Sequence, residues 1–198
     1  TSCKKSGPVQ QVLNIIGNLD RNLFEPILIT LYDESKDGSS QLDKFLALDV
    51  PHFHCSLGKV DMLLGRTNAL KNLINKQRVD VIHSLGVFPD FTIARMNAGK
   101  QIITIRNYVW QDYPAKFGKI EGTILALLHL YAIKRAAKTV TCSKSLSKIY
   151  KEKLGLQYDY ICNGVDFDVY SKGAPGEKEE LRKKLDLPHD KIILVYSG

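Results

Sequence analysis

The sequence alternates short apolar runs with longer segments in which apolar residues recur every three or four positions. Runs such as PILITL at 26–31 and VDVIH at 79–83 have the length and continuity of strands that are buried on both faces of a sheet. The first helical pattern carries Val9 and Leu13, and Pro8 stands where a first helical turn tolerates proline. This alternation predicts an α/β fold, a Rossmann-like parallel sheet with helices on both faces.

The same patterns predict helices and strands over most of the remaining chain. Ser143 is a suitable N-cap for one predicted helix, and Gly155 is a suitable stop for it. The other expected strands lie at 52–55, 101–105, 139–142 and 158–162, and the other expected helices at 41–48, 88–97, 120–137 and 177–184, with one long helix spanning Leu63, Leu70, Leu73 and Ile74.

The order of the elements indicates the domain organisation. No strand-like run precedes the first helix, so Thr1–Pro8 is interpreted as the loop after a missing first strand. We expect a Rossmann-like domain over 1–166, a linker over 167–176 that is rich in glycine, and the truncated start of a second domain over 177–198. The final run, Ile192–Tyr196, is expected to pair with the main sheet or with a neighbouring molecule, because an exposed strand edge promotes aggregation.

Composition and charge narrow the function classes. The chain has 28 Lys and Arg against 21 Asp and Glu, and the net charge of +7 suits an anionic membrane, a phosphorylated ligand or nucleic acid. Without an RNA-binding aromatic pattern, a nucleic-acid partner would rest on charge alone and is not expected. The four cysteines lack C-x-x-C and metal-ligand spacing, which indicates reduced, buried thiols of a cytosolic protein and predicts neither a metal nor a cofactor.

Candidate site residues follow the predicted strands or begin a helix. Ser6 and Gly7 stand at a helix N-terminus, where free N–H groups can bind phosphate or a sugar hydroxyl, although most such helix starts are only turns. His83 ends VDVIH, and Arg106 and Asn107 directly follow QIITI. Parallel strands bring such positions to one edge, where ligands gather. A histidine satisfied within its loop and an ordinary exposed arginine are the structural alternatives.

The predicted helix at 120–137 is unusually apolar and has cations at both ends. Its longest apolar run, ILALLHLYAI from Ile124 to Ile133, is too short to span a bilayer, and no signal peptide is visible. Either the helix packs in the core with solvated ends, or its basic rim contacts an anionic membrane surface. The flanking cations are Lys116, Lys119, Lys134, Arg135 and Lys138.

Six segments, taken in order, resemble the family-4 (group 1) retaining glycosyltransferases. The most specific is N-G-V-D, formed by Asn163, Gly164, Val165 and Asp166, which resembles the motif that ends the N-terminal domain of that family. TIRNYVWQDYPAKFGKIEG is similar to a loop of bacterial polysaccharide-building members. The other segments are SGPVQQVLNIIGNLDRNLFEPILITL, VDVIHSLG, TVTCSKSLSKIY and KEELRKKLDLPHDKIILVYSG.

The resemblance implies a GT-B architecture of two Rossmann-like domains that face each other across a cleft, of which this chain is the acceptor-side half. The C-terminal domain would bind the nucleotide-sugar donor, and transfer would retain the anomeric configuration without a metal. The resemblance places Ser6 and Gly7 on the loop near the donor phosphates, Arg106 and Asn107 on the second rim loop and Ser143 on the third. It leaves His83 as the catalytic candidate. The family's paired glycines and second histidine are absent, since Leu85 occupies the position of the latter.

The predicted function is transfer of a sugar to a glycan or lipid-linked acceptor in bacterial polysaccharide biosynthesis. We expect a cytoplasmic protein, with peripheral attachment to the inner face of the plasma membrane as an option. This chain should be inactive alone and should bind the donor weakly, because the expected donor half is absent. The alternatives are a non-enzymatic α/β module for a small anionic ligand and a GT-B-shaped sugar-nucleotide epimerase.

Overall fold

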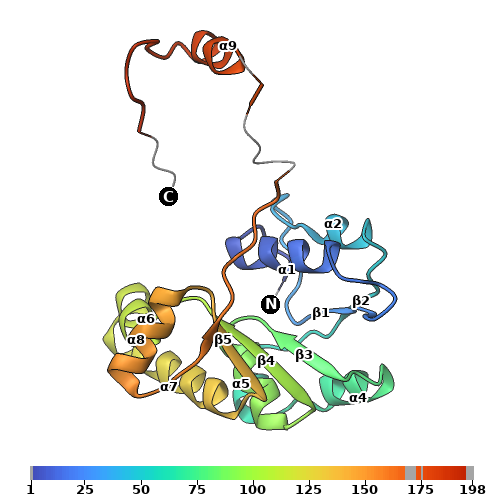
Figure 1. Ribbon diagram of the computed structural model, residues 1–198. Helices are drawn as coiled ribbons and strands as arrows, with labels where there is room; N and C mark the ends of the chain where they lie inside the picture. Colours follow the sequence, from blue (N-terminus) through green and yellow to red (C-terminus); the bar gives the residue numbers. More distant parts are fainter. Residues whose placement is uncertain (1, 168–172, 175, 195–198) are drawn as a thin grey trace. The chain divides into compact units, whose positions relative to one another are not determined.

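The computed structural model describes residues 2–167, 173–174 and 176–194 (Figure 1). The chain divides into two compact units, Thr1–Gly164 and Val165–Gly198. The first unit holds the sheets and the helices α1 to α8, whereas the described part of the second holds helix α9 (Glu177–Lys184). In α9 the acidic residues occupy the first turn and the basic residues the last, an order that the helix dipole favours.

Every strand pair in the described part of the first unit is parallel, which confirms the predicted sheet type. One sheet has the order β1–β2 and the other β3–β4–β5–β6. The strands are β1 (Leu28–Thr30), β2 (His52–His54), β3 (Val81–Ser84), β4 (Lys100–Ile105), β5 (Lys138–Thr141) and β6 (Asp159–Tyr160).

The strand expected before the first helix would lie between the two sheets. The two sheets share one core cluster, in which Leu31 and Ile29 from the β1 side pack with Ile82 of β3. A strand between β1 and β3 would join them in the order 3-2-1-4-5-6 of doubly wound folds. The described residues contain no such strand before α1, and the first strand stays a prediction.

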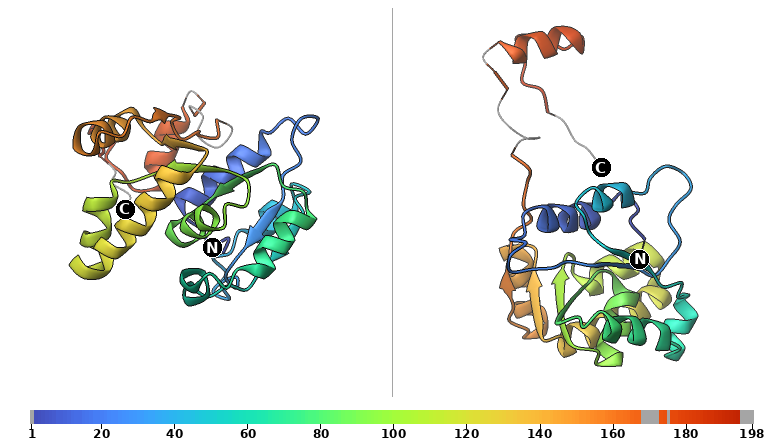
Figure 2. Two further views of the ribbon diagram at one scale, coloured as in Figure 1. Left: turned by 90° about the horizontal axis from the view of Figure 1, so that it is seen from below. Right: turned by 90° about the vertical axis from the view of Figure 1, so that its right-hand side faces the viewer.

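Helices cover both faces of the sheets, as predicted (Figures 1 and 2). On one side, α1 and α2 bury Leu13 and Phe45 in a cluster that reaches Leu28 of β1. On the other side, α3, α4 and α5 pack against Ile29 and Leu31. Alternate residues of β1 therefore face opposite layers. The helices are α1 (Gly7–Gly17), α2 (Leu42–Leu46), α3 (Lys59–Leu64), α4 (Asn68–Lys76) and α5 (Val87–Met96).

A further core cluster lies under the β4–β5 part of the larger sheet. Ile103 and Ile105 of β4 pack there with α6 (Val109–Phe117), α7 (Lys119–Arg135) and α8 (Lys144–Leu154). Helix α7 is therefore largely a core helix, as one of the two sequence interpretations held. Its exposed large apolar residues, Ile120, Ile124, Leu127 and Tyr131, recur along the face opposite the core.

Two elements differ from the sequence prediction. The expected long helix is divided into α3 and α4, because Gly65 adopts φ 77° and ends α3 in the left-handed region. The segment taken as a loop after Arg106 contains helix α6, although Pro114 lies inside it. Proline removes one helical hydrogen bond, but burial of Val109 and Tyr113, four positions apart, fixes this helix on the core.

Two smaller expectations are corrected. Ile192 and Leu194 are 91% and 93% exposed and pair with no strand among the described residues. A strand needs a partner for its backbone groups, and the described part of this unit contains no other strand; positions 195–196 of the expected strand lie outside the described residues. Of the four free cysteines, Cys3 and Cys55 are buried, but Cys162 is exposed after the short strand β6.

Candidate functional site

The predicted site residues lie along the carboxyl edge of the larger sheet. His83 pairs in register with Ile102 of β4, and Arg106 directly follows the last residue of β4. Ser143 follows β5 at the same edge, because Thr141 is in register with Ile105. The parallel sheet thus brings the positions after β3, β4 and β5 to one rim, the place where ligands of open α/β sheets bind.

His83 and Arg106 interact at this rim. The His83 Nε2 atom lies 3.0 Å from the Thr104 hydroxyl. The pKa of His83 lies below its ordinary value of 6.5, mainly because the surrounding protein desolvates the ring, and additionally because the Arg106 guanidinium repels the protonated form. Asp90 acts in the opposite direction. The imidazole is therefore neutral at pH 7 and can either donate or accept a hydrogen bond.

We expect His83 to titrate below pH 6.5, and Arg106→Gln to move its pKa upward, because removing a nearby positive charge favours the protonated ring. The folded chain then binds fewer protons than the unfolded chain, so the contribution of His83 to stability is complete above pH 6.5 and falls as the pH drops below it. An NMR titration of the ring protons measures the pKa of His83 in the unmodified chain and in Arg106→Gln. Arg135→Gln is the control variant. A His83 pKa that Arg106→Gln leaves unchanged would contradict the rim geometry.

The N-G-V-D motif is tied to the rim by its first two residues. The Arg106 Nη1 group donates to Asn163 Oδ1 at 3.2 Å. The Gln11 side chain of α1 makes two hydrogen bonds with the Gly164 backbone, one to its carbonyl and one from its N–H, both 3.0 Å. The other half of the motif, Val165 and Asp166, is exposed and belongs to the second unit. Sequence reasoning did not find Gln11, which looks like any polar residue on an amphipathic helix.

Both predicted site serines cap helices. Ser6 Oγ accepts from the Val9 N–H at 3.4 Å at the start of α1. Ser143 Oγ accepts from the Leu146 N–H at 3.2 Å at the start of α8. Gly7 is exposed, and a Cβ added there would meet no atom within 4 Å. Each serine oxygen thus accepts one capping hydrogen bond, its hydroxyl proton can still be donated, and the space beside Gly7 is open.

Asn107 lines a rim pocket of about 310 Å³. Its backbone carbonyl accepts from the Tyr150 hydroxyl at 3.2 Å, which fixes this turn of the chain above the core. Aromatic rings, lysines and carboxylates share the lining, a combination that suits a sugar ring with hydroxyl and phosphate groups. The pocket is lined by Tyr32, Lys59, Gly86, Val87, Phe88, Pro89, Asn107, Asp112, Tyr113, Lys116, Phe117, Glu121 and Leu125.

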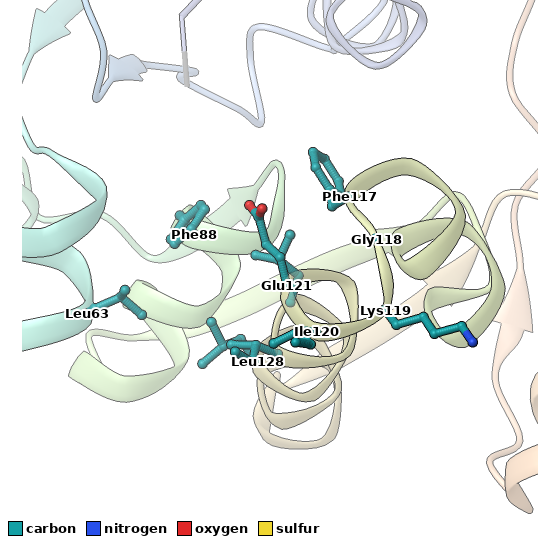
Figure 3. A pocket seen from close by; sticks show the side chains of 10 residues that line it. Leu63, Phe88, Phe117, Gly118, Lys119, Ile120, Glu121 and Leu128 are labelled. Atoms are coloured by element: carbon teal, nitrogen blue, oxygen red, sulfur yellow. The ribbon is translucent and has the colours of Figure 1, made fainter.

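An apolar groove of about 700 Å³ adjoins the rim pocket, with which it shares Phe88, Phe117, Glu121 and Leu125. Ile120 and Ile124 of α7, which also line it, are 81% and 53% exposed. Figure 3 shows the Glu121 carboxylate between the rings of Phe88 and Phe117, while Lys119 extends away from the other side chains. The remaining lining residues are Leu63, Gly118, Lys119 and Leu128.

A buried polar network behind the pocket was not expected. Asp90 Oδ2 lies 3.0 Å from His129 Nε2, and His129 Nδ1 lies 2.7 Å from the Tyr113 hydroxyl. The one signal in the sequence is His129 itself, a lone polar residue within ILALLHLYAI. Its partners Asp90 and Tyr113 lie 39 and 16 positions away in the sequence, so only the folded chain brings the three side chains together.

Among the residues that the structure describes, no group of three or more His, Cys, Asp or Glu side chains is arranged to hold a metal ion. None of the helices in those same residues combines the length and apolar character required to cross a membrane.

The parallel sheet flanked by helices, with its loops at the carboxyl rim, is similar to one half of a solved GT-B glycosyltransferase. The HepE structure from Anabaena, solved with UDP, aligns with a TM-score of 0.67 over 94% of this chain and 48% of HepE, at 14% identity. The family model for glycosyltransferase family 4 matches residues 5–169, and the chain belongs to that family.

Two curated relatives from Escherichia coli are also similar to the chain. Both are O-antigen biosynthesis glycosyltransferases named WclY, each 29% identical over 98% of this chain. The chain spans about half the length of these relatives, since the matches cover 50% of each.

Proposed function

We propose that the whole protein transfers a sugar from a nucleotide-sugar donor to a glycan or lipid-linked acceptor in bacterial polysaccharide biosynthesis, and that this chain supplies the acceptor side. The observation that carries the proposal is the convergence of His83, Arg106 and Asn107 at one rim, beside the rim pocket and the apolar groove. Membership of glycosyltransferase family 4 supports the reaction class, and the O-antigen role of the WclY relatives supports the pathway class.

The two adjoining hollows support the lipid-linked form of the acceptor. The rim pocket offers polar groups for glycan hydroxyls, and Lys59 and Lys116 provide positive charge for phosphate. The groove offers the exposed apolar side chains of Ile120 and Ile124 to a lipid chain. Together with Lys119, these lysines and apolar residues also support peripheral contact with the anionic inner face of the plasma membrane, and hence a cytoplasmic location.

The donor belongs to the other half of the protein in this proposal. HepE was solved with UDP, and by analogy a nucleotide-sugar is the proposed donor here. We propose that residues 167–176 link the acceptor-side domain, 1–166, to a donor domain that starts at 177. A chain limited to the acceptor side would then be inactive and would bind the donor weakly.

The rim residues suggest how transfer is promoted. Arg106 carries a guanidinium suited to phosphate, and the neutral His83 ring can hydrogen-bond a sugar hydroxyl or stabilise developing charge. Burial lowers the pKa of Arg106 from its ordinary value, yet arginine stays charged at neutral pH. Stabilisation of the departing phosphate and of an oxocarbenium-like sugar would supply the catalysis, with retention at the anomeric carbon.

The test is a transfer assay with the full-length protein, radiolabelled nucleotide-sugars and bacterial membranes that carry lipid-linked glycans. We expect label to enter an organic-extractable product, and Arg106→Ala to lower the rate about a hundredfold, as loss of one electrostatic group does elsewhere. Lys36→Ala, at an exposed loop position, should keep the wild-type rate. Release of a free, isomerised sugar would instead establish the epimerase alternative, and binding without turnover would establish the binding module.

A further inference from the structure

The chain segment that follows β6 runs along the carboxyl rim and is anchored at two points. At its start, the Ile161 N–H donates to the Thr141 carbonyl of β5 at 2.9 Å. At its end, the Gly164 backbone makes its two hydrogen bonds with the Gln11 side chain of α1 (Figure 1). Asn163 is exposed and lies between these anchors. The segment is thus held at both ends by contacts in which the Asn163 side chain has no part.

The Asn163 side chain instead contacts Arg106, which follows β4, two strands away from β6 in the sheet. Arg106 Nη1 donates to Asn163 Oδ1 at 3.2 Å. A guanidinium has donors only, so the oxygen of the carboxamide must be the atom that faces it. The NH₂ group of Asn163 therefore points elsewhere, and within the described part of the chain it has no hydrogen-bond partner.

Arg106 also has N–H groups without a partner. Its Nε atom is buried and makes no hydrogen bond with any described residue. None of the ion pairs among residues 2–167, 173–174 and 176–194 includes its guanidinium. Burial lowers the pKa of Arg106, because loss of water disfavours the cation. A half-buried cation that lacks a directly paired carboxylate is stabilised when an anion binds to it.

We propose that Arg106 and Asn163 together bind a phosphate group at the carboxyl rim, the guanidinium through its remaining N–H groups and the carboxamide through its NH₂ group. Both side chains offer only donors there, and ionised phosphate oxygens only accept. The inference rests on the proposed function in taking this phosphate to belong to a substrate, either the donor nucleotide or a lipid-linked acceptor. Asn163 thereby has a binding role that its place in the boundary motif does not indicate.

Removal of the Asn163 side chain separates this role from a purely structural one. If the carboxamide only occupied Arg106, Asn163→Ala would free Nη1, and phosphate would bind at least as tightly as before. If the carboxamide donates to phosphate, the same substitution should raise the Kd for phosphate about tenfold, as expected for one lost hydrogen bond to a charged group. The two roles therefore predict changes of opposite direction.

NMR on the 198-residue chain with ¹⁵N-labelled arginine and asparagine measures this Kd in a titration with inorganic phosphate at constant ionic strength. We expect saturable shifts of the Arg106 Nε–H and Asn163 NH₂ signals, and the higher Kd in Asn163→Ala, read from the Arg106 signal. Asn22→Ala, at an exposed turn position, should keep the wild-type Kd. Titrations with UDP and with farnesyl phosphate distinguish the two sources, because the true source should shift the same signals at the lower concentration.

Asn163 signals that inorganic phosphate, UDP and farnesyl phosphate all leave unchanged would overturn the inference. A Kd that Asn163→Ala leaves unchanged or lowers would also overturn it. The shifts are read in the unmodified chain, so the first outcome does not depend on how well a variant folds. Because phosphate binding requires no sugar transfer, a failed transfer assay with the expected NMR result would reject the proposed function alone. The reverse combination would reject the phosphate site alone.

Discussion

Gly122→Ala will destabilise the chain by about 3 kcal/mol, at the upper end of the range for forcing extra volume into a packed core. Gly122 lies in α7 against the backbone of α6, and a Cβ added there would stand 2.4 Å from Pro114 N and 2.5 Å from the Tyr113 carbonyl carbon. Backbone atoms cannot turn aside as a side chain can, so α6 must move away from α7. Alanine's better helix propensity, about 1 kcal/mol, offsets only part of this cost.

Urea denaturation measures the loss as a lower midpoint with an unchanged m-value. The matched control is Gly17→Ala at the end of α1, where the new Cβ would meet only a Leu48 methyl at 3.9 Å and stability should change little. Trp110, the one tryptophan of the chain, lies on α6, and its fluorescence should shift to the red as that helix loosens. A Gly122→Ala chain with the wild-type midpoint would mean that α6 does not pack on α7 as described.

Local patterns predict most of the fold because each predicted strand or helix has its own apolar periodicity. QIITI becomes β4, and the Ser143 cap and Gly155 stop of α8 both occur as expected. Helix α6 escapes prediction because Pro114 locally disfavours a helix. Its formation depends on burying Val109 and Tyr113 and on the close approach of Gly122, contacts that only the folded chain supplies.

The candidate site likewise has features that the sequence predicts and features that it does not. The positions of His83, Arg106 and Asn107 at one rim follow from strand order alone, because residues after parallel strands share an edge. Side-chain partners do not follow from strand order. Nothing local shows that Gln11 holds Gly164, because the two residues lie far apart in the sequence.

His129→Leu will destabilise the chain by about 3–5 kcal/mol, because it leaves a buried carboxyl group and a buried hydroxyl without a partner, at about 1–3 kcal/mol each and more where the group is charged. Without the imidazole, the Asp90 carboxyl group, 4% exposed, must either keep a buried charge with no partner or take up a proton. Both options cost free energy at neutral pH. The Tyr113 hydroxyl also loses its partner, which adds the penalty of an unsatisfied buried donor.

A second His–Asp pair on this chain provides the control, because it has nearly the same distance at the surface. His54 Nε2 lies 3.1 Å from Asp33 Oδ1, but these side chains are 37% and 90% exposed. Water solvates Asp33 whether or not the imidazole is present, so His54→Leu should change the free energy of unfolding by less than about 1 kcal/mol. Parallel urea titrations of the two variants therefore compare one contact at two degrees of burial. Equal losses of unfolding free energy would mean that the distance between histidine and aspartate, and not their burial, sets the strength of the contact. They would also mean that Asp90 is not enclosed by α5 and α7 as described.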